Sequence, residues 1–163
     1  MSAPWSGRLF SGMHSLVRRY LKTGIGFLLL GLVLGGWMLV ERELLGRYPG
    51  PYITSAHTHA ILVGFVMMMI LGVALWLFPR PEKGDERYRP EMADAAYWLI
   101  AVGTLGRVVG ELLRQASAAP ALRWGVVLFG LAQIAGVALF FHTMWPRIRP
   151  VGSQVREAKG ERF

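Results

Sequence analysis

Four apolar blocks divide the chain, and charged or turn-forming residues separate them. The blocks cover approximately Ile25–Val40, His59–Phe78, Ala95–Leu113 and Leu122–His142. A helix of about 20 apolar residues spans the roughly 30 Å hydrocarbon layer of a bilayer. The pattern therefore predicts an all-α fold, an integral membrane bundle of four transmembrane helices in contact with membrane lipid.

The residues before the first span have a different pattern. Apolar side chains recur there at helical spacing with arginines between them, which is typical of an amphipathic helix lying on the membrane surface. This segment lacks a small-residue cleavage site, so we do not interpret it as a cleaved signal peptide. We expect an N-terminal interfacial segment at 1–22, a transmembrane domain at 23–146 and a basic cytoplasmic tail at 147–163.

Turn and capping residues mark the ends of the spans. Two glycines and two prolines lie between the first and second spans, where they end one helix and begin the next. Thr54 or Ser55 is suited to cap the amino end of the second span. Asp94 is a plausible start for the third.

The distribution of positive charge predicts how the chain is oriented. Thirteen lysines and arginines lie before the first span, between the second and third spans and in the tail, against four on the opposite side. The positive-inside rule therefore places both termini in the cytoplasm, and we expect a multi-pass protein of the bacterial inner membrane. Because the basic residues flank apolar blocks, we do not interpret the net charge of +8 as a sign of a nucleic-acid partner.

The chain has no cysteine. This excludes disulfides, cysteine-ligated zinc, iron–sulfur clusters and covalently attached c-type haem. The sequence contains four histidines, whose imidazoles can bind a metal.

His57 and His59 lie at the mouth of the second span, where imidazoles can bind a metal ion or haem iron. At about 100° per residue, positions two apart point to nearly opposite sides of a helix, so the pair cannot chelate one ion. One helix could serve two sites, or one ring could bind iron while the other makes a hydrogen bond or meets a partner subunit. Both could also be solvated residues at the membrane surface. His142 lies roughly 30 Å away at the other end of a span, and we interpret it and His14 as interfacial.

Arg107 and Glu111 lie four residues apart inside the third span, in the same half of the membrane as the two histidines. Ionisable residues within a span are costly and usually face a partner or a cavity. One interpretation is a self-satisfied ion pair. The other is that Arg107 pairs with a haem propionate, since a carboxylate and a guanidinium interact strongly and directionally in a low dielectric.

The second span also carries a family resemblance. Its string His57-Thr-His59-Ala60, followed by Gly64-Phe65, Gly72, Trp76-Leu77 and Pro79-Arg80, resembles the tenth helix of the catalytic subunit (subunit I) of haem–copper oxidases, in particular the cbb3 type and the nitric oxide reductases. The resemblance implies haem b as cofactor, with His57 and His59 serving two haems on opposite faces of one helix. The four-span layout is similar to small stand-alone relatives of subunit I.

The chain also departs from that family. The family's catalytic subunit has about a dozen spans, and its copper site needs three further histidines on other helices. Only His14 and His142 remain here, and neither is suitably placed. We therefore leave open whether the chain is an enzyme and do not expect it to reduce oxygen alone. A haem could be five-coordinate or take its second ligand from a second copy.

Two functions fit these observations best. The first is a membrane-embedded haem protein for electron transfer in a respiratory chain or for binding of nitric oxide or oxygen. The second is a non-catalytic accessory subunit of a respiratory oxidase or nitric oxide reductase, without its own haem. Such a protein would be a homo-oligomer or part of a larger complex, docking through glycine faces such as Gly31/Gly35 and Gly106/Gly110. A transporter or channel has weaker support, because no inverted repeat is visible.

Overall fold

The computed structural model describes residues 6–78, 90–148 and 159–160, and helices are the only regular elements within these ranges. The elements in chain order are α1 (Ser6–Glu43), α2 (Pro51–His59), the π-helical segment η1 (Ala60–Met67), α3 (Met68–Leu77), α4 (Pro90–Ala116), α5 (Pro120–Met144) and the short 3₁₀ turn η2 (Trp145–Arg147).

Within the described residues, four helices are long and apolar enough to cross a membrane. They are Ser15–Glu43, Pro51–Leu77, Glu91–Ala116 and Pro120–Met144. The second of these is one continuous helix made of α2, η1 and α3. The predicted all-α fold with four spans is confirmed.

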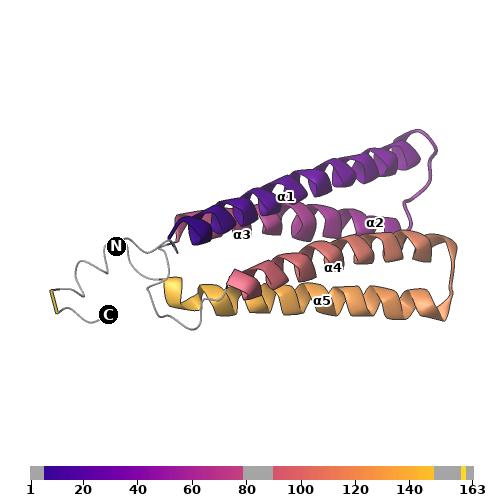
Figure 1. Ribbon diagram of the computed structural model, residues 1–163. Helices are drawn as coiled ribbons and strands as arrows, with labels where there is room; N and C mark the ends of the chain where they lie inside the picture. Colours follow the sequence, from indigo (N-terminus) through magenta and orange to yellow (C-terminus); the bar gives the residue numbers. More distant parts are fainter. Residues whose placement is uncertain (1–5, 79–89, 149–158, 161–163) are drawn as a thin grey trace.

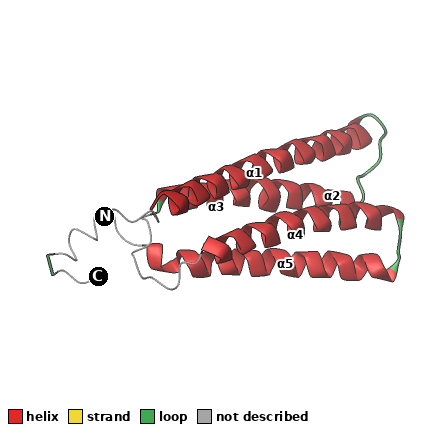
Figure 2. Ribbon diagram, viewed as in Figure 1, coloured by secondary structure: helices red, strands yellow, loops and turns green. Residues whose placement is uncertain are grey.

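The four spans form two helical hairpins that lie side by side (Figure 1). In the first hairpin α1 packs on the continuous helix α2–η1–α3, and in the second α4 packs on α5. The hairpins join where α2 lies against α4. Figure 2 shows that short loops link the helices within each hairpin at one end of the bundle. Helix α2 therefore has neighbours on two sides, with α1 on one and α4 on the other.

Helix α1 continues through the segment that we expected to form a separate interfacial helix. No proline interrupts the chain between Ser6 and Glu43, and the helix is unbroken over that range. Leu16 and Tyr20 are buried in a core shared with α3, α4 and α5, so the segment joins the bundle before residue 22. The domain bounds and the position of the N-terminal end on the membrane stay predictions.

The core is centred at the end of the bundle where α3 finishes. Tyr20, Met68, Ile100 and Phe140 are fully or almost fully buried there and come from four different helices. Arg147 closes this end: its Nη2 donates to the backbone carbonyl oxygens of Leu75 (3.2 Å) and Phe78 (3.0 Å), which lie at the end of α3. A helix end leaves such carbonyls without intrahelical partners, and a basic side chain can satisfy them.

Arg147, the first residue of the predicted tail, therefore connects the end of α5 to α3. The tail beyond Ile148 lies outside the described residues, apart from 159–160. Pro79 and Arg80, which belong to the family-like string, also lie outside them.

The glycine faces that we expected to receive a partner are filled within the chain. A Cβ added at any of the four glycines would approach a side chain of a neighbouring helix to 3.0 Å or less. The expected docking through these faces is therefore wrong, because their space serves the packing of α1 on α2–η1 and of α4 on α5. The approaching side chains are Ile61 at Gly31, His57 at Gly35, Phe129 at Gly106 and Val126 at Gly110.

Two expected helix starts are also wrong. The second span begins at Pro51 with Gly50 as its N-cap residue, one turn before Thr54 and Ser55. Proline suits the first helical position because its ring fixes φ and its missing N–H would have no partner there. The third span likewise begins at Pro90, and Asp94 forms an ion pair with Arg19 of α1.

The tight packing of α4 on α5 can be tested at Gly136. A Cβ there would lie 2.7 Å from Ile100 Cγ1 and 2.9 Å from Leu99 Cβ. Because these atoms lie close to the backbone of α4, we expect Gly136→Ala to lower the free energy of unfolding by about 1–3 kcal/mol, the usual cost of overpacking. The measurement is denaturant unfolding in detergent micelles.

Gly125→Ala on the same helix is the matched control, because nothing lies within 4 Å of its added Cβ. It should be neutral or stabilising, since alanine has the higher helix propensity. Equal stability of the two variants would contradict this packing.

Candidate functional site

His57 faces α1. Its Nδ1 lies 2.9 Å from the backbone carbonyl oxygen of Gly31, and a carbonyl can only accept, so Nδ1 is the donor. The ring also lies against Gly35, where an added Cβ would meet His57 Cε1 at 3.0 Å. Gly35 thus leaves the space on α1 in which the imidazole sits, while Gly31, one turn away, accepts the hydrogen bond and leaves space for Ile61.

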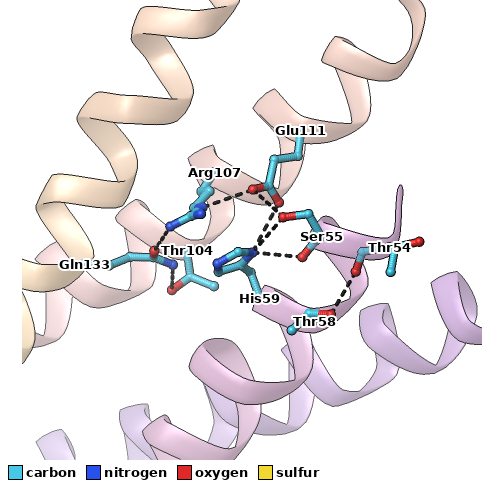
Figure 3. Close-up of polar contacts among 8 residues, drawn as sticks. All are labelled: Thr54, Ser55, Thr58, His59, Thr104, Arg107, Glu111 and Gln133. Carbon is cyan, nitrogen blue, oxygen red and sulfur yellow. Dashed lines mark hydrogen bonds and ion pairs between the residues drawn. The ribbon is translucent and has the colours of Figure 1, made fainter. Parts of the chain in front are cut away.

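His59 faces the opposite side, toward α4. Its Nδ1 lies 2.8 Å from the backbone carbonyl oxygen of Ser55 and 3.3 Å from Glu111 Oε2 (Figure 3). The side chain is 20% exposed. The predicted placement of the two rings on opposite faces of one helix is confirmed, and neither ring is simply a solvated surface residue.

The two imidazoles share one hydrogen-bonding arrangement. In each, Nδ1 donates to a backbone carbonyl, which in a neutral ring leaves the lone pair on Nε2. Among the described residues we find no hydrogen bond to either Nε2. In Figure 3 this nitrogen of His59 points away from Ser55 and Glu111. A ring fixed through Nδ1 with a free lone pair on Nε2 is the form in which histidine binds a metal.

Glu111 gathers donors from two helices. Its Oε1 accepts hydrogen bonds from Ser55 Oγ of α2 (2.9 Å) and from Arg107 Nε of α4 (3.1 Å). The carboxylate is 3% exposed, whereas Arg107 is 28% exposed. The interpretation of residues 107 and 111 as an ion pair is confirmed, and the pair contacts His59.

The polar contacts continue from Arg107 to α5. Arg107 Nη1 lies 3.4 Å from Gln133 Oε1, and Gln133 Nε2 donates to Thr104 Oγ1 at 3.0 Å. Thr104 in turn donates to the backbone carbonyl of Ile100 at 2.7 Å. A connected polar network therefore runs from α2 through α4 to α5, as Figure 3 shows.

Sequence reasoning missed three members of this network, namely Ser55, Thr104 and Gln133. Each is a polar residue in or beside an apolar block, which is a signal that could have been used. The sequence could not give their partners, because the contacts join residues 26 to 56 positions apart.

A π-helical segment begins directly after His59. Segments of this kind, with hydrogen bonds five residues apart, are rare and frequently occur at functional sites. Gly64 within it packs so closely on α1 that an added Cβ would lie 2.4 Å from the Phe27 ring. The segment separates the histidine-bearing turns from the core-packing turns of α3.

The other histidines do not join this cluster. His142 is exposed in the last turns of α5, at the opposite end of the bundle from Glu111, and the side chain of His14 lies outside the described residues. Within the described part of the chain no three histidine, cysteine or acidic residues are grouped to hold a metal ion.

Comparison with protein families decides the relationship. The profile of the family described as Cytochrome C and Quinol oxidase polypeptide I matches residues 15–157, which is most of the chain. The protein belongs to this family. Members of the oxidase polypeptide I family typically bind haem and work as subunits of respiratory complexes. Comparisons with curated proteins and with solved structures gave no match.

The energetic coupling within the site can be measured with a double-mutant cycle at residues 107 and 111. Arg107→Met leaves the buried carboxylate without its cation, and we expect the free energy of unfolding to fall by about 3 kcal/mol. Arg107→Met/Glu111→Leu should lose less than the sum of the two single variants, with a coupling of at least about 1 kcal/mol. Strict additivity would mean that the ion pair contributes nothing to the fold.

Proposed function

We propose that this member of the oxidase polypeptide I family is a membrane-embedded b-type haem protein, with His57 and His59 as axial ligands. The observation that carries the proposal is the shared state of the two rings. Each Nδ1 donates to a backbone carbonyl, and each Nε2 keeps its lone pair. A bound haem would supply a one-electron redox centre and a site for a diatomic gas, nitric oxide or oxygen.

The arrangement of the rings supports two separate sites more than one shared site. His57 lies at the interface with α1 and His59 at the interface with α4. Neighbouring helices in the described residues offer no second histidine at either place, so a second axial ligand would come from another copy of the chain or stay absent. The motif His57-Thr-His59 favours the cbb3-type and nitric oxide reductase branch of the family.

Arg107 is proposed as the partner of a haem propionate. Its Nε and Nη1 already bond to Glu111 and Gln133, while among the described residues no hydrogen bond to Nη2 is found. A guanidinium has five N–H donors in a planar fork, so it can hold a protein carboxylate on one edge and a propionate on another.

The proposed activity is electron transfer or gas binding rather than oxygen reduction. The family's copper site needs three histidines besides those on this helix, and the sequence has two others. We further propose that the protein is a multi-pass component of the bacterial inner membrane with both termini in the cytoplasm. The excess of lysine and arginine on one side of the spans supports that orientation.

Purified protein tests the proposal directly. After expression with haem supply and extraction in mild detergent, it should show a Soret band, and reduction should give the bands of a b-type cytochrome. We expect His57→Ala and His59→Ala each to lower the ratio of haem to protein, because each removes one axial nitrogen. Pyridine haemochrome assay measures that ratio.

His142→Ala is the matched control, since it removes an exposed histidine at the other end of the bundle. It should leave the ratio of haem to protein unchanged. Protein that is colourless and stays colourless when haem is added would refute the proposal.

An accessory subunit without haem is the second candidate, and one observation favours it. Both imidazoles and Arg107 find hydrogen-bond partners inside the chain, so the bundle does not depend on a cofactor for these contacts. Co-purification of colourless protein with a larger haem-bearing subunit would support this function. Isolation of coloured protein without such a partner would count against it.

A further inference from the structure

We propose that Glu111 acts as a positioning residue for His59 and makes its imidazole a more basic ligand to iron than that of His57. Iron held by His59 would then have a lower reduction potential than iron held by His57. This inference rests on the proposed haem function and concerns how the chain distinguishes its two ligand positions.

The two rings differ in what surrounds Nδ1. At His57 the described acceptor is a neutral backbone carbonyl, that of Gly31. At His59 the carbonyl of Ser55 (2.8 Å) is joined by the Ser55 hydroxyl and by a carboxylate oxygen, Glu111 Oε2, each at 3.3 Å. One ring therefore experiences a neutral acceptor and the other a neutral acceptor together with an anionic one.

One carboxylate oxygen of Glu111, Oε2, is available to interact with the His59 ring. Oε1 is bound by Ser55 and Arg107, whereas Oε2 is buried and has no hydrogen bond in the described structure. A buried carboxylate oxygen without a donor is costly, and the Nδ1 of His59 lies 3.3 Å from it. The bonds to Oε1 fix the carboxylate so that Oε2 remains turned toward the ring.

Ligation would strengthen this contact. When Nε2 gives electron density to a cation, the Nδ1–H becomes more acidic and donates a stronger hydrogen bond, and the carboxylate in turn raises the basicity of the ring. The effect is larger for the more highly charged ferric ion than for ferrous iron. Glu111 therefore favours the ferric form at His59, and His57 has no described carboxylate that would do the same.

The effect of the positive charge of Arg107 on the reduction potential must be distinguished from the effect of the Glu111 carboxylate. Arg107 partly neutralises the carboxylate, so removing Glu111 alone also leaves a cation beside the site. Comparing the double variant Arg107→Gln/Glu111→Gln with Arg107→Gln isolates the carboxylate, because both lack the guanidinium that is also proposed to hold a propionate. Loss of the carboxylate facing His59 should change the potential in the same direction with and without Arg107.

The test is a spectroelectrochemical titration of the haem-loaded protein in detergent. We expect Glu111→Gln relative to wild type, and the double variant relative to Arg107→Gln, to weaken ferric relative to ferrous binding at His59 by about 10-fold, the lower end of the effect of outer ligand partners. That ratio corresponds to a rise of about 59 mV in one redox component. The resonance Raman iron–imidazole stretch of that component should move to lower frequency.

Two controls identify the component and the cause. His59→Ala should remove the component that shifts, while His57→Ala should retain it. Glu41→Gln on α1 removes another carboxylate with a buried oxygen that lacks a partner, and it should leave both potentials unchanged.

Each result has a defined meaning. Wild-type protein that binds no haem would overturn both this inference and the proposed function. Haem-loaded protein whose potentials and stretch frequency are the same in Glu111→Gln as in wild type, and in the double variant as in Arg107→Gln, would overturn this inference alone. The same holds if the shifted component survives in His59→Ala.

Discussion

A carboxylate inside a membrane-spanning helix has to find its hydrogen-bond donors within the protein, because the hydrocarbon layer supplies none. One oxygen of Glu111, Oε1, finds its donors in Ser55 of α2 and Arg107 of its own helix, and Arg107 reaches on to Gln133 of α5. These contacts lie where the two hairpins join. The fit of the second span against the third is therefore specified by polar contacts at one end of the bundle and by apolar packing at the other.

That division explains why the histidine-bearing end can hold a defined geometry although its apolar core is small. The buried apolar cluster there consists of Ala56, Ala60 and Val108, with partly buried leucines around it, whereas the larger cluster around Tyr20 and Phe140 lies at the end closed by Arg147. Small side chains bring α2 close to α4, and the hydrogen bonds then fix which residues meet. The chain belongs to the oxidase polypeptide I family, whose members typically bind haem, and this end of the bundle carries the two imidazoles that we propose as ligands.

The parts of this structure that depend on local pattern could be predicted from the sequence. Apolar block length gave the four spans, and a rotation of about 100° per residue gave the opposite faces of His57 and His59. The ion pair of Arg107 and Glu111 followed from a spacing of four.

Features that depend on tertiary contacts could not be predicted in this way. The partners of Ser55 and Gln133 are distant in sequence. The glycine faces could equally have packed against another chain. The burial of Leu16 and Tyr20 depends on contacts with apolar residues of α3 and α4, which the local pattern around residues 16 and 20 does not contain.

The π-helical segment has a consequence for how the length of the second span can vary. It accommodates its residues in wider turns, and the loss of a single residue between Ala60 and Met67 would let the segment relax to an ordinary α-helix. Because a π turn holds about one residue more than an α turn, the shortened helix would turn through nearly the same total angle, and His57 and His59 would keep their direction relative to Leu71 and Leu75. The loss of one residue from α2 or α3 would instead rotate one end of the span by about 100° against the other and turn the imidazoles away from their neighbours on α1 and α4. Changes of length are thus tolerable in the loop from 44 to 50 and, by one residue, in η1, whereas in the α-helical parts of this span the residue count sets the direction in which the histidines point.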